Sequence, residues 1–103
     1  MVNRETLRRF KPRSMLVNAS RGGLVDTGAL VEALREGPLG AAALDVYEHE
    51  PHVPPELLEL ENVVLEPHVG SATTATRDAM ARLVAENVIA VLAGRPPLTP
   101  VSR

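Results

Sequence analysis

Three short aliphatic segments constrain the fold of this chain more than any other feature of its sequence. They cover residues 14–18, 41–46 and 63–65. Their length and composition predict buried strands. Residues 41–46 are rich in alanine, which favours helix, but their position between a helix stop and a proline-rich loop favours a strand. Strands separated by helices pair in parallel through right-handed crossovers, so we expect an α/β fold with a parallel sheet of about three strands and flanking helices.

Helical segments lie before, between and after these strands. Capping and periodicity predict a short helix over about residues 4–10 and a second helix that ends near residue 36, with Asp26 or Thr27 as its N-cap. A long C-terminal helix is predicted over about residues 75–93, with Thr74 as its N-cap and a glycine at its end. The proline-rich residues that follow are expected to form an arm or linker.

Composition excludes several classes of function. The 103 residues suffice for one domain, and the net charge of −2 comes without a basic stripe, so no nucleic-acid partner is expected. Aromatic residues make up only 2%, which argues against a base-stacking platform. No apolar run is long enough for a membrane span or a signal peptide, and the cytoplasm is the default location. The absence of cysteine excludes disulfides and thiolate chemistry.

Polar residues of complementary chemistry follow each predicted strand. Arg21 comes after the first strand, Asp45, Glu48 and Glu50 come after the second, and His68 comes after the third. Ligands of open parallel sheets bind outside the carboxyl ends of the strands. The sequence therefore predicts that these side chains meet at one edge of the sheet.

This set of side chains suits the reduction of a 2-keto acid. An arginine on a glycine turn can bind a carboxylate through two hydrogen bonds. A histidine can give or take a proton near neutral pH, and a carboxylate bonded to that histidine fixes its tautomer. The hydride would have to come from a cofactor.

Three segments resemble the C-terminal part of the D-isomer-specific 2-hydroxyacid dehydrogenase family, whose members include glyoxylate/hydroxypyruvate reductases and phosphoglycerate dehydrogenases. They are LVNASRGGLVD (16–26), ALDVYEHEP (43–51) and NVVLEPHVGSAT (62–73). Their order and spacing match the family, and the resemblance covers nearly the whole chain. It implies a partial Rossmann-type sheet and an NAD(P)-dependent oxidoreductase that acts on a small 2-keto or D-2-hydroxy acid.

The resemblance also implies roles for single residues. Arg21 would bind the carboxylate and keto oxygen of the substrate. His68 would be the general acid for reduction and the base for oxidation, and Glu50 would hold and tune His68. NAD or NADP would contact Arg21, His68 and Asp45, which receives the nicotinamide carboxamide in the family. Backbone contacts to the nicotinamide end would come from Ala19 and Gly70.

The chain departs from the family in one respect, since no G-x-G-x-x-G loop occurs in it. Residues 1–73 are expected to be the C-terminal half of an NAD(P)-binding domain, and residues 74–103 a return helix and tail that join a substrate domain. We therefore expect a fragment that binds NAD(P)H weakly or not at all. Pairing with a second copy or with a missing N-terminal segment would cover the uncovered helix face and sheet edges.

Three other readings remain open at this stage. His49 and His52 could form a metal site with His68, but their loop is proline-rich and lacks a helical i, i+4 pair. Ser20 or Ser71 could serve a Ser–His–Asp hydrolase, although the G-x-S-x-G elbow is missing. The chain could also be a catalytically inactive truncated remnant or an oligomerising interaction module.

Overall fold

The computed structural model describes residues 1–101. The chain divides into two compact units, of which the first spans Met1–Gly70 and the second begins at Ser71. The elements of the first unit are α1 (Arg4–Leu7), β1 (Ser14–Asn18), the 3₁₀ turn η1 (Gly22–Leu24), α2 (Thr27–Arg35), β2 (Leu39–Leu44), α3 (Pro55–Leu58) and β3 (Val63–Leu65).

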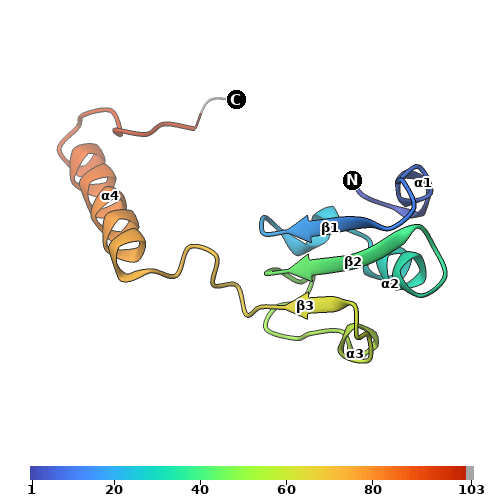
Figure 1. Ribbon diagram of the computed structural model, residues 1–103. Helices are drawn as coiled ribbons and strands as arrows, with labels where there is room; N and C mark the ends of the chain where they lie inside the picture. Colours follow the sequence, from blue (N-terminus) through green and yellow to red (C-terminus); the bar gives the residue numbers. More distant parts are fainter. Residues whose placement is uncertain (102–103) are drawn as a thin grey trace. The chain divides into compact units, whose positions relative to one another are not determined.

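The three strands form one parallel sheet with β2 at its centre (Figure 1). Asn18 at the end of β1 pairs with Leu44 at the end of β2, and Leu44 pairs with Leu65 at the end of β3. All three strands therefore end at the same level, along one edge of the sheet. The predicted three-stranded parallel sheet is confirmed.

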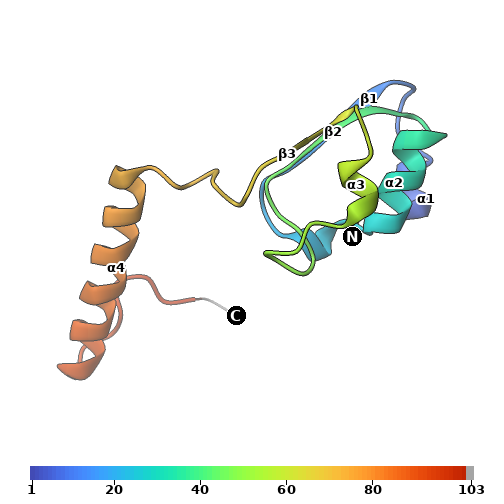
Figure 2. The same ribbon diagram turned by 90° about the horizontal axis from the view of Figure 1, so that it is seen from below.

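The helices of the first unit cover one face of this sheet. Figure 2 shows α1, α2 and α3 on the same side of the strands. Leucines from both layers are buried between them: Leu7, Leu16, Leu30, Leu34, Leu44 and Leu57. Side chains alternate between the two faces of a strand, and those on the other face are exposed. Met15 is 76% exposed, Val17 73% and Val64 58%.

Two predicted boundaries were wrong by a few residues. α1 ends at Leu7 rather than near residue 10, because Arg9 and Phe10 donate to carbonyls three residues back and tighten the chain into turns. β2 spans Leu39–Leu44 rather than residues 41–46. The buried Leu39 pairs with Ser14 in the sheet, so the ladder begins earlier than the alanine run suggests.

The second unit consists of α4 (Thr74–Leu92) and the residues that follow it. Thr73, not the predicted Thr74, is the N-cap, since its hydroxyl accepts the Thr76 N–H at 3.2 Å. Gly94, with φ of 71°, ends the helix in the left-handed conformation that favours glycine. The tail after α4 was predicted to be an arm or linker, but Thr99 is held against the helix. Asn87 Nδ2 donates to the Thr99 hydroxyl and Asn87 Oδ1 accepts the Thr99 N–H, each at 3.1 Å.

Apolar side chains of α4 are widely exposed. Met80 is 50% exposed, Val84 63% and Ile89 60%, and Ala90 is its buried residue. The predicted apolar residues are therefore present on α4, but most of these side chains are exposed. Across residues 1–101, no helix combines the length and the apolar character that crossing a bilayer requires.

Candidate active site

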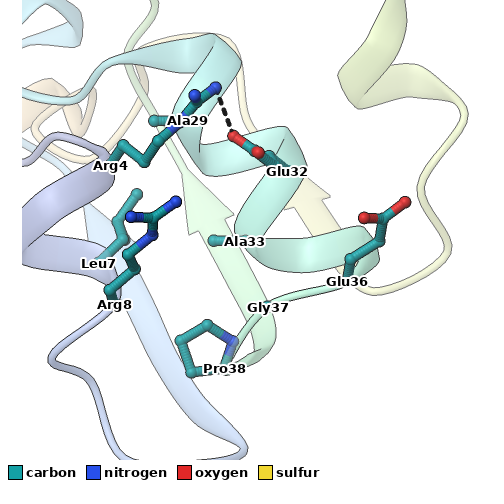
Figure 3. A pocket seen from close by; sticks show the side chains of 9 residues that line it. All are labelled: Arg4, Leu7, Arg8, Ala29, Glu32, Ala33, Glu36, Gly37 and Pro38. Carbon is teal, nitrogen blue, oxygen red and sulfur yellow. Dashed lines mark ion pairs between the residues drawn. The ribbon is translucent and has the colours of Figure 1, made fainter.

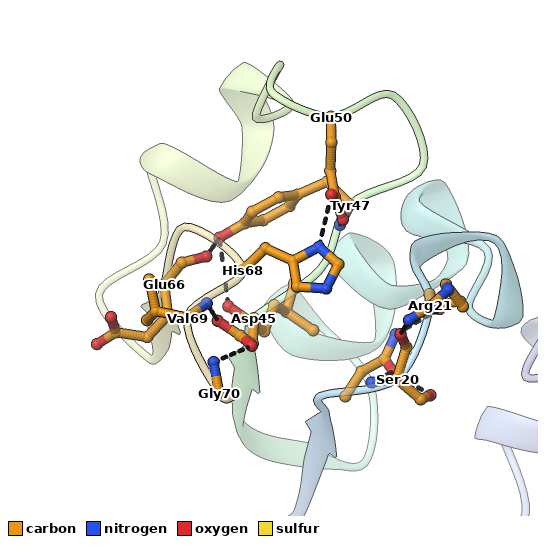
Figure 4. Close-up of polar contacts among 11 residues, drawn as sticks. Ser20, Arg21, Asp45, Tyr47, Glu50, Glu66, His68, Val69 and Gly70 are labelled. Carbon is orange, nitrogen blue, oxygen red and sulfur yellow. Dashed lines mark hydrogen bonds and ion pairs between the residues drawn. The ribbon is translucent and has the colours of Figure 1, made fainter. Parts of the chain in front are cut away.

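The residues predicted to carry the chemistry gather at the carboxyl edge of the sheet (Figure 4). Arg21 lies in the loop after β1, Asp45 and Glu50 follow β2, and His68 follows β3. All four belong to the first unit. The common level at which the parallel strands end brings together side chains that are up to 47 residues apart in the sequence, from 21 to 68.

His68 and Glu50 form a direct pair. His68 Nδ1 lies 2.7 Å from Glu50 Oε2, and the other carboxylate oxygen of Glu50, Oε1, accepts the backbone N–H of Tyr47 at 3.0 Å. The His68 hydrogen bond and then the Tyr47 N–H hold the pKa of Glu50 below its ordinary value, and the Arg21 guanidinium adds to this effect. Glu50 is therefore a carboxylate fixed at both oxygens. It favours a proton on Nδ1 of His68 and leaves Nε2 to face the site.

The backbone of His68 is in an unusual conformation, with φ of 57°. Left-handed backbone at a residue other than glycine costs free energy and is found at functional sites. The turn directs two successive N–H groups back to Asp45, from Val69 to Oδ1 at 2.6 Å and from Gly70 to Oδ2 at 2.8 Å. These two bonds hold the pKa of Asp45 below its ordinary value. Asp45 thereby ties the loop after β3 to the end of β2.

A buried asparagine shapes the loop that carries Arg21. Asn18 is 6% exposed, and its Nδ2 donates to the backbone oxygen of Arg21 at 3.0 Å. Its Oδ1 accepts the N–H of Ser20 at 3.2 Å and the Ser20 hydroxyl at 3.0 Å. Arg21 Nη1 donates to the Ser20 oxygen at 2.6 Å. Within residues 1–101 no carboxylate forms an ion pair with Arg21.

The remaining predicted contact residues lie at the same edge. Ala19 is exposed directly after β1, and Gly70 is exposed beside Asp45. A Cβ at Gly70 would lie 2.8 Å from Asp45 Oδ2, so a larger residue there would push against the Asp45 carboxylate.

Two residues of the site were not singled out from the sequence. Asn18 is the last residue of the first predicted strand, although an asparagine at a strand end, whose side chain can bond to the backbone two residues on, is a known signal for a turn. Tyr47 was read as loop, yet its ring is buried at 8% exposure and its hydroxyl donates to Glu66 O at 2.9 Å. One of only two aromatic residues in the chain, it has the polar group that a buried tyrosine must satisfy.

Among the hollows on the first unit, two differ in how close they lie to the His68–Glu50 pair. One, of about 230 Å³, lies beside the His68–Glu50 pair and is lined mainly by apolar groups of Tyr47, Val53 and Leu65. The other, of about 200 Å³, lies between α1 and α2, where Arg4 and Glu32 form an ion pair of 2.6 Å (Figure 3). The second hollow includes Pro38, just before β2, and so lies away from the carboxyl edge.

The residues considered for a metal site and for a Ser–His–Asp hydrolase are arranged differently from what those sites need. Among residues 1–101, no three histidine, aspartate or glutamate side chains are grouped so that they could hold a metal ion. The Ser20 hydroxyl donates to Asn18 and is part of the turn that carries Arg21.

A parallel sheet whose polar loops follow the carboxyl ends of its strands is the arrangement of Rossmann-type nucleotide-binding domains. Residues 1–70 match the family described as D-isomer specific 2-hydroxyacid dehydrogenase, NAD binding domain. This chain belongs to that family.

Several known proteins resemble the chain over its whole length. It is 54% identical over 103 residues to a glyoxylate reductase of Thermococcus onnurineus, covering 100% of this chain and 31% of the relative. It is 54% identical over 101 residues to glyoxylate/hydroxypyruvate reductase A of Arabidopsis thaliana, covering 98% and 32%. The solved structure of an NADPH-dependent glyoxylate/hydroxypyruvate reductase of Sinorhizobium meliloti, in complex with NADP and malonate, superposes with a TM-score of 0.93 at 46% identity, covering 98% and 32%. The chain thus spans about a third of the length of these relatives.

Proposed function

We propose that the chain contributes the acid–base pair and the substrate-binding arginine of an NAD(P)-dependent reductase that converts small 2-keto acids to D-2-hydroxy acids. The observation that supports this proposal most strongly is the 2.7 Å contact between His68 Nδ1 and Glu50 Oε2 at the edge of the sheet where Arg21 also lies. The relatives with the names glyoxylate reductase and glyoxylate/hydroxypyruvate reductase favour glyoxylate and hydroxypyruvate as substrates. Phosphoglycerate is a further candidate.

Arg21 would bind the substrate carboxylate and keto oxygen. One of its guanidinium nitrogens bonds to Ser20 O, and the planar group carries further N–H donors that match a carboxylate. His68 would donate the proton from Nε2 to the keto oxygen during reduction and accept it during oxidation. Glu50 would keep Nδ1 protonated and would hold the imidazole in place between turnovers.

The described residues fit the nicotinamide end of the cofactor. Each oxygen of Asp45 accepts one backbone N–H, and since a carboxylate has about four acceptor positions, it can still accept a carboxamide N–H₂ group. Ala19 and Gly70 would let the ring approach their backbone. When bound, the cofactor would supply the hydride. The sequence has no glycine-rich loop for the pyrophosphate, so we propose weak binding of NAD(P)H by the 103 residues alone.

The test is oxidation of NADH or NADPH by the purified chain that depends on glyoxylate or hydroxypyruvate, at high cofactor concentration so that weak binding does not hide turnover. We expect His68→Asn to abolish turnover. Arg21→Lys should raise KM for the keto acid roughly tenfold or more, because a hydrogen bond to a charged group contributes about 1.5–3 kcal/mol. Arg77→Lys, on α4, is the matched control. Turnover that survives His68→Asn would contradict the proposal.

Cofactor binding is measured separately by isothermal titration. Weak or absent binding is expected, and tight binding of NADH in the micromolar range would overturn this expectation about the isolated chain. Turnover and binding are distinct results, because a weakly bound cofactor can still react.

A second candidate function is that of an inactive remnant or an oligomerising module. The exposed apolar residues Met15, Val17 and Val64 on the open face of the sheet favour it, since contiguous exposed apolar surface marks interaction sites. Size-exclusion chromatography combined with the assay separates the two candidates. An associated chain without turnover on glyoxylate or hydroxypyruvate would favour the second candidate.

A further inference from the structure

The loop that carries His68 is held on both sides by residues that follow β2. Before His68, the Tyr47 hydroxyl donates to Glu66 O at 2.9 Å. After His68, the Asp45 carboxylate accepts the next two backbone N–H groups. Figure 4 shows the Tyr47 ring and Asp45 reaching this loop from the end of the central strand. The unusual backbone of His68 therefore lies between two fixed points.

Tyr47 also contacts the other member of the pair. Its backbone N–H donates to Glu50 Oε1 at 3.0 Å, while its side chain holds the segment that leads to His68. A single residue thus sets the position of the carboxylate through its main chain and the position of the imidazole through its hydroxyl. Because the ring is buried at 8% exposure, it is a rigid connection between the two.

We propose that Tyr47 is a positioning residue for the Glu50–His68 pair. Its hydroxyl fixes the loop so that Nδ1 of His68 faces Glu50 and Nε2 faces the site. The chemical use of Nε2 rests on the proposed function, but the placement of the ring does not. Asp45 shares this task from the other side of His68.

A purely structural role would be the alternative explanation for Tyr47. Any buried tyrosine needs an acceptor for its hydroxyl, and the hydroxyl also lies 3.2 Å from Leu44 O. The two roles differ in what the loss of the hydroxyl does. A structural role predicts lower stability alone, whereas positioning also predicts a change in the protonation pattern of the His68 ring.

The experiment compares the protein with its Tyr47→Phe variant, which keeps the ring. Nitrogen NMR of ¹⁵N-histidine-labelled protein at about pH 9, well above the ordinary histidine pKa, reports which ring nitrogen carries the proton. We expect His68 to be protonated on Nδ1. In Tyr47→Phe the ratio of the Nδ1–H to the Nε2–H form should fall roughly threefold to tenfold, as the loss of one hydrogen bond implies.

The chain offers internal and matched controls. His49 and His52 make no ring hydrogen bond in the described part of the chain, so they report the ordinary tautomer in the same spectra. Ser14→Ala removes a hydroxyl that also donates to a backbone oxygen, Lys11 O at 2.7 Å, at the opposite end of β1. It should leave the His68 tautomer unchanged.

The outcomes are distinct. A reduced Nδ1–H fraction in Tyr47→Phe, but not in Ser14→Ala, supports the proposal. An unchanged His68 tautomer in Tyr47→Phe, whatever happens to its thermal stability, overturns it, as does a protein whose His68 is protonated on Nε2 from the start. Failure of the proposed function would appear as absent turnover in the reductase assay. The NMR measurement of the His68 tautomer does not depend on turnover, so the two failures can be told apart.

Discussion

Gly22 lies directly against the backbone that joins Tyr47 to Glu48. A Cβ at position 22 would come within 2.0 Å of the Tyr47 carbonyl carbon and 2.3 Å of the Glu48 nitrogen. Real Cβ atoms do not approach backbone this closely, so only glycine allows the loop after β1 to touch the loop after β2. This contact brings the turn that carries Arg21 toward the loop that carries Glu50.

Replacement of Gly22 by alanine should therefore separate the two loops. We expect Gly22→Ala to lower the free energy of unfolding by about 1–3 kcal/mol, the usual cost of overpacking, as measured by urea denaturation. Gly23→Ala is the control, because a Cβ at Gly23 meets nothing within 4 Å. Equal stability of the two variants would show that the loops are not in contact.

The hydrogen bonds of Asn18 predict a more local effect, on the turn that carries Arg21. The loss of its side chain in Asn18→Ala removes one of the two donors to Arg21 O, the other being the Leu24 N–H at 3.2 Å, and removes the acceptor of the Ser20 N–H. Ser20 and Arg21 are exposed, so water can replace the lost partner. Because an ordinary hydrogen bond contributes about 0.5–1.5 kcal/mol net, the variant should be less stable by about that amount. The Ser20 amide should also exchange its hydrogen faster, and KM for the keto acid should rise.

The control for Asn18 is Asn62→Ala. Asn62 also donates to two backbone oxygens, Leu34 O and Gly40 O, each at 3.3 Å, but it precedes β3 and lies away from the site. Asn62→Ala should lower the free energy of unfolding without changing the rate of hydrogen exchange at the Ser20 amide. If both variants accelerated that exchange alike, the effect would be global rather than a property of the Arg21 turn.

The lowered pKa values of Asp45 and Glu50 predict that the protein loses folding stability in acid. Backbone N–H groups lower the pKa of Asp45 from the ordinary 3.8, and the His68 hydrogen bond lowers that of Glu50 from the ordinary 4.5. A carboxyl group whose pKa is lower in the folded state stabilises the fold above its unfolded pKa, and this contribution is lost as pH falls through the folded value. Each contribution should be present above the ordinary pKa of its group and should decline as the pH falls below it, from 4.5 for Glu50 and from 3.8 for Asp45.

The measurement is urea denaturation at a series of pH values from about 7 to about 2. In Asp45→Asn the acid-dependent loss should become smaller, because one titrating group is removed. Asp78→Asn, on α4, removes a carboxylate that makes no hydrogen bond or ion pair in residues 1–101, and it should keep the wild-type profile. An Asp45→Asn profile identical to that of the wild type would refute the role of Asp45.

The sequence was sufficient for the sheet and for the central pair, and the reason is geometric. Parallel strands that end at one level place whatever follows them at one edge, so the positions of Glu50 and His68 after neighbouring strands predicted their contact. The hydrogen bonds that hold the His68 loop in place could not be predicted in this way. The bonds from Asp45 to Val69 and Gly70 depend on the positive φ of His68, which no local pattern specifies.

The same limit applies to the uncovered surface. Aliphatic runs predict burial, yet Val17 is 73% exposed on the open face of the sheet. Burial of that face depends on a partner rather than on the segment itself. The sequence pattern therefore predicts self-association of the chain when nothing else covers the face.

Val17→Lys tests this prediction. A charged side chain on the exposed apolar face of the edge strand β1 opposes pairing, so the variant should be monomeric at concentrations at which the wild type elutes early and shows a higher mass by light scattering. Leu58→Lys is the control, since Leu58 is 66% exposed on α3, on the helical side. If Leu58→Lys dissociated the protein as well as Val17→Lys, or if the wild type were monomeric at every concentration, the sheet face would not be the site of association.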